Sequence, residues 1–454
     1  MTAPLETTQS LCPICLARLS ARLVRQADIV YFEKTCSDHG RFRVPVWRGA
    51  PSLENWRRPK QPVRGLATQT AAAGGCPFDC GLCPEHRQRS CTVLIEVTRH
   101  CDLKCAVCFA DSGRCGDDPG RETVAAWLEK AWQATGGCNI QFSGGEPTLR
   151  DDLPDLVGLA RRQGFDFIQI NTNGLRLARE PGLARTLRDA GAASIFLQFD
   201  GTREATYRLL RGRPLLKQKR AAIEACAAAG LGVVLVPTLV PGVNTGEIGS
   251  ILKTALEHFP TVRAVHFQPI SYFGRYPGPP ADSGRLTLPE LMREVEIQSG
   301  GAFPVADFKP AGCENPRCSF HAQYLIDSQG RPRTHLSVGS AAASEESAEA
   351  GAHRAISFVA RQWSAAPPEN RPPVPLQPAA CDCGSAPELD LDAFLRQARS
   401  RSFSVSAMAF QDVWNLDLER VRDCCIHVFS PRGRLIPFCL YNLTSVQGRP
   451  LYRE

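Results

Sequence analysis

The chain of 454 residues is 43% hydrophobic and 22% charged, values typical of a soluble globular protein with room for two to four domains. No apolar run reaches the ~18 residues of a membrane-spanning helix, and the first residues lack the basic and apolar regions of a secretory signal. We therefore expect a cytoplasmic protein. The net charge of +7 permits contact with phosphates, including peripheral association with lipid headgroups, although a solvated arginine-rich surface explains it equally well. Nucleic acid is not the expected partner.

Twenty cysteines are the strongest compositional signal. Thiols stay reduced in the cytoplasm, so clustered cysteines there predict metal binding rather than disulfides. The first cluster lies within residues 1–50, where Cys12 and Cys15 form one pair and Cys36 and His39 a second. Two pairs with two-residue gaps suit a single tetrahedral ion, and a module this small needs that ion in order to fold. We expect a mononuclear zinc or iron site here.

Residues 51–91 form a connector that ends in a second cysteine cluster. Its members Cys76, Cys80 and Cys83 have a three-then-two spacing, and Cys91 follows as a candidate fourth ligand. Four thiolates normally hold a cubane iron–sulfur cluster. We therefore expect a closed auxiliary [4Fe–4S] cluster in this segment.

The same spacing recurs at Cys101, Cys105 and Cys108, directly after the apolar strand-like run 92–98. Spacing alone does not separate the two triads, so the context decides. A triad that follows a strand and has no fourth cysteine beside it would leave one iron of a cubane open to another ligand. We expect the open cluster at this second triad.

Strand-like and helix-like patterns alternate over residues 92–270, which predicts a parallel sheet wrapped by helices. In such barrels the chemistry lies at the carboxyl ends of the strands. The basic residues of 208–220 are expected on a solvated helix face, with binding of an anionic group as the alternative. The candidate site residues at the strand ends are Gly144, Gly145, Glu146, Asn171, Asn173, Gln198 and Asp200.

Residues 271–454 form a carboxyl-terminal extension that is also marked by cysteines. The stretch near 340–380 is rich in Ala, Ser, Glu and Pro, and we expect a flexible insertion there. Cysteines on both sides of it are expected to form a second closed auxiliary cluster, with Cys424, Cys381 and Cys383 as alternative ligands. The set that we favour is Cys313, Cys318, Cys425 and Cys439.

The triad at 101–108, the turn Gly144-Gly145-Glu146-Pro147 and the strand end Asn171-Thr172-Asn173-Gly174 together resemble the radical SAM superfamily. The resemblance implies a partial (β/α)6 barrel, S-adenosylmethionine (SAM) on the open cluster, an external one-electron donor and a 5′-deoxyadenosyl radical. It places the glycine turn at the methionine part of SAM and the two asparagines at the ribose. Gln198 and Asp200 are weaker candidates for cofactor contact.

The order of cysteine motifs from Cys12 to the tail Ile436-Pro437-Phe438-Cys439 resembles the tetraether lipid synthase family, whose relatives are also described as pterin-methylating enzymes. This resemblance implies three cubane clusters, a rubredoxin-like site and carbon–carbon coupling of two lipid alkyl chains, which is our main hypothesis. The alternative is a radical SAM methyltransferase that acts on a pterin. A remote third hypothesis is a non-catalytic iron–sulfur and zinc scaffold. A long apolar channel would favour lipids, whereas a short pocket with carboxylates or amides would favour the pterin.

Overall fold

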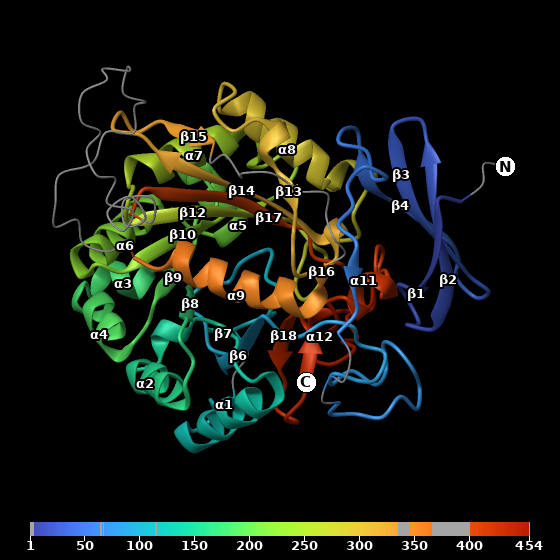
Figure 1. The fold of residues 1–454 in the computed structure, drawn as a ribbon, viewed down its shortest axis with the longest axis horizontal. Helices are drawn as coiled ribbons and strands as arrows, with labels where there is room; N and C mark the ends of the chain where they lie inside the picture. The colour runs from blue at the N-terminus through green and yellow to red at the C-terminus, as the bar shows by residue number, and fades with distance from the viewer. Residues whose placement is uncertain are drawn as a thin grey trace, which may run out of the picture.

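The computed structural model describes residues 4–63, 66, 68–113, 116–334, 346–365 and 400–453. A small antiparallel sheet lies at one side of a large mixed α/β unit (Figure 1). No helix in the described part of the chain is long and apolar enough to span a membrane.

The small sheet is a four-stranded meander in which each strand pairs with the next along the chain. Alternating apolar residues give it a core, with Val30, Phe32 and Trp47 almost fully buried. The buried Lys34 Nζ donates to the carbonyl of Val413 at 2.6 Å, which fixes the module to the carboxyl-terminal region. Its strands are β1 (Glu6–Leu11), β2 (Arg18–Gln26), β3 (Ile29–Cys36) and β4 (Gly40–Arg48).

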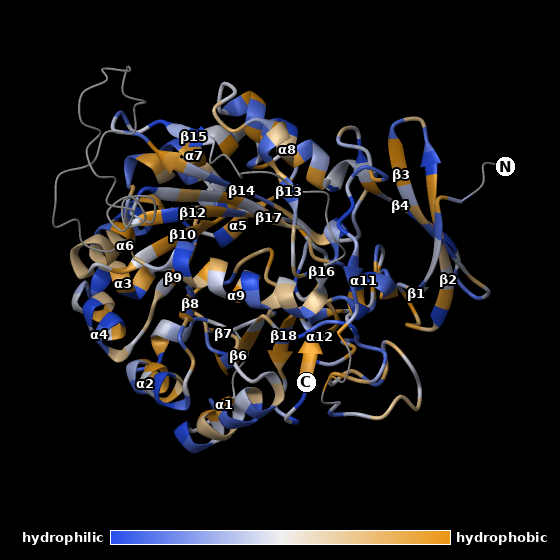
Figure 2. Cartoon of the chain, in the orientation of Figure 1, coloured by the Kyte–Doolittle hydropathy of each residue, from blue (hydrophilic) through white to orange (hydrophobic). Residues whose placement is uncertain are grey.

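Six parallel strands form the centre of the large sheet and confirm the predicted parallel α/β barrel. Figure 2 shows apolar residues concentrated on these strands, as expected for parallel strands that are covered by helices. The strands are β6 (Thr92–Thr98), β7 (Asn139–Gly144), β8 (Ile168–Thr172), β9 (Ser194–Gln198), β10 (Gly232–Val236) and β12 (Val262–Pro269). The helices that follow them are α1 (Arg121–Thr135), α2 (Leu153–Gln163), α3 (Leu175–Arg179), α4 (Gly182–Ala190), α5 (Glu204–Arg211), α6 (Leu216–Ala229) and α7 (Ile248–Glu257).

The segment after residue 270 extends this sheet at both edges. Strand β17 (Ser402–Met408) pairs in parallel with β12, and β18 (Ile426–Phe429) pairs in parallel with β6. Both edges of the barrel sheet, which would otherwise present unpaired backbone groups, are thereby covered. The remaining elements are β5 (Lys60–Gln61), β11 (Thr238–Leu239), α8 (Leu288–Gln298), β13 (Lys309–Pro310), β14 (Ser319–Ile326), β15 (Pro332–Thr334), β16 (Glu346–Ser347), α11 (Leu418–Arg422), β19 (Leu435–Pro437) and α12 (Phe438–Asn442).

Helix α9 (Ala348–Trp363) lies inside the stretch that was expected to be a flexible insertion, so that expectation is wrong for residues 346–365. The rest of the stretch up to residue 380 lies outside the described residues. An alanine-rich sequence favours a helix as well as a flexible segment. Small residues also let the helix pack closely, because a Cβ on Gly351 would lie only 2.3 Å from the carbonyl oxygen of Gly312.

Contacts along α9 place it across the amino ends of the barrel strands. The carbonyl of Ile356 accepts from Asn139 at the start of β7, and that of Gln362 accepts from Arg263 near the start of β12. Figure 1 shows the helix crossing in front of the strands. The amino end of the barrel is therefore covered, whereas the expected chemistry lies at the carboxyl end.

Candidate active site and metal-binding cysteine groups

A cavity of about 520 Å³ occupies the interior of the barrel and connects its two ends. At the carboxyl ends of the strands it is lined by the triad Cys101, Cys105 and Cys108 and by the glycine turn. At the amino ends it is lined by Cys91, Cys313 and residues of α9. The cavity therefore touches two different groups of cysteines.

The loop that carries Cys101, Cys105 and Cys108 follows β6 and is fixed by two arginines. Arg275 Nε donates to the carbonyl of Cys105 at 2.8 Å, and Arg211 Nη1 donates to the carbonyl of Val107 at 3.1 Å. Burial raises the pKa of Cys101 to about 12 and also raises that of Cys105. Buried thiols without a metal favour their protonated form, whereas an iron–sulfur cluster binds them as thiolates.

The glycine turn lies directly against the loop of the triad. Gly145 N donates to the carbonyl of Thr98 at 2.8 Å, and Glu146 N donates to that of His100 at 2.7 Å. A Cβ at Gly145 would lie only 1.9 Å from the carbonyl oxygen of His100. The two glycines were expected to make room for SAM; in the structure the close approach that excludes a side chain is made by the protein's own backbone.

Glu146 is fully buried and its carboxylate is engaged within the protein. Its oxygens accept from Thr172 Oγ1 at 2.6 Å, from Asn173 N at 2.6 Å and from Thr148 Oγ1 at 2.5 Å. Burial raises the pKa of Glu146, and these hydrogen bonds oppose the rise. The side chain thus joins the end of β7 to the end of β8, while Gly144, Gly145 and Glu146 together line the cavity.

The predicted ribose and cofactor residues fall into two groups. Asn171 and Gln198 line the cavity, and Asn171 Oδ1 is buried without a partner among the described residues, as expected for an acceptor facing a bound hydroxyl. Asn173 instead donates to Asp102 Oδ1 at 2.7 Å within the triad loop. Asp200 is fully buried in a bidentate ion pair with Arg211, at 2.6 and 2.7 Å, and supports that arginine.

Two basic residues at this site were missed by the sequence analysis. Within the segment 208–220, expected to be a solvated face, Arg211 and Lys219 are buried. Lys219 Nζ donates to the carbonyl of Asn173 at 2.5 Å and to Gln198 Oε1 at 3.3 Å. Arg211 ends α5 and Lys219 lies in α6, so their burial follows from the packing of two helices, which a count of basic residues does not reveal.

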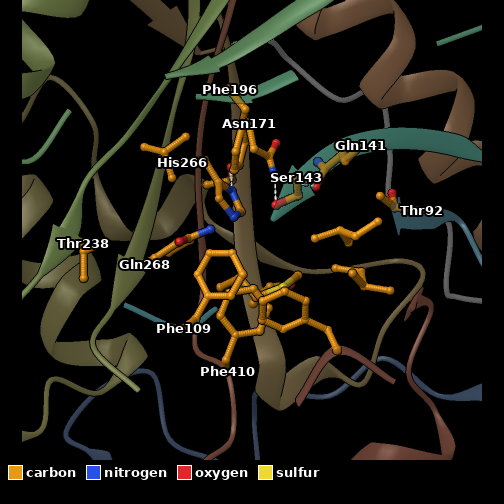
Figure 3. Close-up of a pocket in the computed structure, with 18 of the residues that line it drawn as sticks. Thr92, Phe109, Gln141, Ser143, Asn171, Phe196, Thr238, His266, Gln268 and Phe410 are labelled. Atoms are coloured by element: carbon orange, nitrogen blue, oxygen red, sulfur yellow. Dashed lines mark hydrogen bonds between the residues drawn. The ribbon is translucent and has the colours of Figure 1, made fainter. Parts of the chain in front are cut away.

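Aromatic and amide side chains form the middle of the cavity. The ring of His266 lies 5.5 Å from that of Phe196 and 5.7 Å from that of Trp363, and its Nδ1 is 2.9 Å from Ser406 Oγ. Burial lowers the pKa of His266 to about 4, so the imidazole is neutral near pH 7. Figure 3 shows His266, Asn171 and Gln268 converging on one space, with the rings of Phe109 and Phe410 on its other side.

The structure brings the expected ligands of the small sheet together. The donor atoms of Cys12, Cys15, Cys36 and His39 all lie within 4.8 Å of one another. The hairpins β1–β2 and β3–β4 carry the two pairs at their turns, so the antiparallel register sets their spacing.

The predicted auxiliary sets are rearranged. Cys76, Cys80 and Cys83 line a small separate pocket with His86 and Arg422, and Cys91 is not part of it. Cys91 belongs to the start of β6, where its N donates to the carbonyl of Cys425 before β18. The structure groups Cys91 with Cys313 and Cys425 rather than with the triad 76–83, because Cys91 directly precedes β6, which pairs with β18.

The expected carboxyl-terminal set is divided between two places. The thiols of Cys313 and Cys425 lie within 4.8 Å of Cys91. Cys318 accepts from the guanidinium of Arg420 at 3.3 and 3.4 Å, and Cys439 and Cys424 lie near it. Burial raises the pKa of Cys424, and the thiols of Cys439 and Cys318 raise it further. The adjacent Cys424 and Cys425 contribute to different groups. The alternatives Cys381 and Cys383 lie outside the described residues.

The chain is similar to several known proteins. The radical SAM superfamily profile matches residues 95–255, and that of the HMPTM N-terminal zinc ribbon domain matches residues 4–48. The chain is 33% identical to the 7,8-dihydro-6-hydroxymethylpterin dimethyltransferase of Methanocaldococcus jannaschii over 96% of this chain and 93% of that protein. It is 29% identical to the GTP 3',8-cyclase of Paenarthrobacter nicotinovorans over 45% of this chain and 57% of that protein. SuiB of Streptococcus suis bound to S-adenosylmethionine is a weaker structural match, with a TM-score of 0.38 and 15% identity over 46% of this chain and 47% of that chain.

The protein is a radical SAM enzyme with an amino-terminal zinc ribbon. Its cofactors are SAM and [4Fe–4S] iron–sulfur chemistry, with a further metal site in the ribbon, and it requires a one-electron reductant. Within the superfamily, the chain belongs to the family of the 7,8-dihydro-6-hydroxymethylpterin dimethyltransferase to which it is similar over almost its full length.

We predict that Gly145→Ala destabilises the site. The added Cβ would push against the carbonyl of His100 and displace the triad loop, at a cost on the order of 1–3 kcal/mol. The iron and acid-labile sulfide bound per chain should fall, and the thermal unfolding midpoint should fall as well. The matched control is Gly246→Ala, because a Cβ there meets nothing within 4 Å. Normal iron content in Gly145→Ala would contradict this account of the turn.

His266 should make stability depend on pH. Its folded pKa of about 4 lies below the ordinary 6.5, so the unfolded chain binds the proton first and stability is lost as pH falls through that window. The contribution is about 2 kcal/mol between pH 7.5 and pH 5. Urea unfolding at these two pH values should show a smaller loss for His266→Gln than for the wild type. The partly exposed His258→Gln is the control, and equal losses in His266→Gln and wild type would refute the prediction.

Proposed function

We propose that this protein is a radical SAM methyltransferase that acts on a dihydropterin. The observation that carries the proposal is the 33% identity, over 96% of this chain, to an enzyme named for dimethylation of 7,8-dihydro-6-hydroxymethylpterin. A match of this extent includes the zinc ribbon, the barrel and the carboxyl-terminal strands together.

The lining of the cavity supports a flat, polar ring as substrate. Amide side chains from β7, β8, β9 and β12 line the cavity, and amides pair with the mixed donors and acceptors of a pteridine. They are Gln141, Asn171, Gln198 and Gln268. The rings of Phe196 and Trp363 offer faces for stacking. The amides are the feature that was expected for the pterin alternative, although the cavity itself extends from one end of the barrel to the other.

Coupling of two lipid alkyl chains, the main hypothesis from the sequence, has weaker support. An alkyl chain in this cavity would offer no partner to Asn171 Oδ1, which is buried without a hydrogen bond among the described residues, and unpaired buried polar groups are costly. The relative that matches the full chain acts on a pterin by name. A non-catalytic scaffold would have no use for a cavity that joins the triad to an amide-lined wall.

The residues of this chain would position the reactants and exclude water. When bound, SAM and its cluster supply a radical able to take hydrogen from carbon, chemistry that the cofactor provides. Arg211 and Arg275 hold the triad loop in place, and Asn171 offers an acceptor beside it. The neutral His266 and the amide of Gln268 would orient the ring, while α9 closes the amino end of the barrel to solvent.

The first test is methylation in vitro. We expect the anaerobically reconstituted full-length protein, with SAM, a one-electron reductant and 7,8-dihydro-6-hydroxymethylpterin, to form 5′-deoxyadenosine and a pterin heavier by one or two methylene units in mass spectrometry. Cys105→Ala should abolish both products because it removes a ligand of the open cluster. Formation of 5′-deoxyadenosine with no change in pterin mass, together with altered lipids in cells that express the protein, would favour the lipid hypothesis.

The second test concerns substrate recognition by Gln268. Replacing its amide in Gln268→Leu removes a hydrogen-bonding group while keeping similar volume, and the KM for the pterin should rise roughly tenfold or more, since such a bond is worth on the order of 1–3 kcal/mol. Iron and sulfide per chain should equal those of the wild type. An unchanged KM would show that the ring binds elsewhere in the cavity.

A further inference from the structure

Three cysteines meet at the amino end of the barrel. The Sγ atoms of Cys91, Cys313 and Cys425 all lie within 4.8 Å of one another, and all three residues are buried. They come from the start of β6, from the loop after β13 and from the residue before β18. Ala352, Ala355 and Ile356 pack around them. Segments that are far apart in the sequence therefore converge on one group of thiols.

The spacing of these thiols fits one ion. Two thiolates bound to the same tetrahedral ion at 2.3 Å are about 3.8 Å apart, whereas thiolates on different irons of a cubane are separated by the width of the cluster. Among the described residues, the ligand atoms of this group all lie within 4.8 Å of one another, and so do those of the ribbon residues Cys12, Cys15, Cys36 and His39. The thiols of the triads at 76–83 and 101–108 are not that close together. The group thus resembles the mononuclear site rather than the cluster sites.

The backbone around the group is fixed before any ion binds. The carbonyl of Cys313 accepts from Gln88 Nε2 and from Lys60 Nζ, each at 2.7 Å. Cys425 Sγ lies 2.9 Å from Cys91 Sγ, closer than the roughly 3.8 Å of two thiolates on one ion and far closer than thiolates on opposite irons of a cubane.

Glu314 offers a carboxylate beside Cys425, although its oxygens are not within 4.8 Å of all three thiols. Its Oε2 lies 3.8 Å from Cys425 Sγ, and its Oε1 accepts from Ser319 Oγ at 2.5 Å, which orients the carboxylate. Ligand carboxylates in metal sites are commonly held by such a second hydrogen bond. The ammonium group of Lys60, bonded to the carbonyls of Cys313 and Glu314, offsets part of the negative charge of three thiolates and a carboxylate.

We propose that Cys91, Cys313 and Cys425, completed by Glu314, bind a second mononuclear ion, a thiophilic divalent cation such as zinc, in addition to the ion of the ribbon. Three thiolates and one carboxylate around a tetrahedral ion match known zinc chemistry. The ion would link the starts of β6 and β18 to the loop after β13. It would close the end of the cavity that is opposite to the SAM triad.

Metal analysis of the full-length, anaerobically purified protein tests the proposal independently of its activity. Zinc, iron and acid-labile sulfide are measured per chain, and a mononuclear ion is metal that has no matching sulfide. The wild type should hold two such ions. Cys36→Ser and Cys313→Ser should each lose one, the double variant should lose both, and the iron bound with sulfide should stay constant. The control is Cys226→Ser, whose thiol is buried in α6, and it should lose none.

Two results would overturn the proposal. One is a loss of iron and sulfide in equal amounts from Cys313→Ser, which would mean that the group holds an iron–sulfur cluster. The other is a single mononuclear ion in the wild type. Should Cys313→Ser fail to fold, zinc X-ray absorption of the wild type loaded with zinc decides: two zinc ions per chain, with a mean shell of three sulfurs and one lighter atom, support the second site, and one zinc per chain rejects it.

Discussion

The site depends on the backbone contact between the end of β6 and the glycine turn after β7. Two hydrogen bonds, from Gly145 N and Glu146 N to the carbonyls of Thr98 and His100, set the triad loop beside the turn. Because the approach leaves no room for a Cβ at Gly144 or Gly145, these two positions require glycine for a reason internal to the protein. The Glu146 carboxylate also accepts hydrogen bonds from Thr172 and Asn173, which fixes the turn to the end of β8. The pairing of β6, β7 and β8 therefore places the cysteine triad, the glycine turn and the asparagines around one end of the cavity.

Local patterns in the sequence predicted this part of the molecule well. The strands β6 to β12 follow from short apolar runs, and their parallel order places Gly144, Asn171 and Gln198 at one end of the barrel. The grouping of Cys12, Cys15, Cys36 and His39 could be predicted because both pairs lie at hairpin turns of one small sheet. In each case the residues that meet are close in sequence or are related by a regular repeat.

Long-range contacts were the part that sequence reasoning did not reach. Cys91 was expected beside Cys83, its neighbour in the chain, but the pairing of β6 with β18 takes it to Cys425, 334 residues away. Cys425 was favoured over Cys424 because it precedes a strand-like run, but the sequence did not show that the two thiols would join different groups. The burial of Arg211 and Lys219 likewise depends on Asp200 and Asn173, which other elements supply.

Helix α9 makes the two ends of the barrel cavity different. At the carboxyl end the strands open toward the triad, as in other parallel barrels. At the amino end α9 covers the strands, and its Trp363 forms part of the same aromatic wall as His266 and Phe196. Because β6 is seven residues long, the cysteines before and after it are separated by roughly 20 Å along the strand. A ring that binds in the middle of the cavity would thus contact the amides and aromatic side chains of the wall, with the reactive chemistry on one side and the group around Cys91 on the other. The amides of that middle section, rather than the count of cysteines, are the structural basis on which we propose a pterin instead of an alkyl chain.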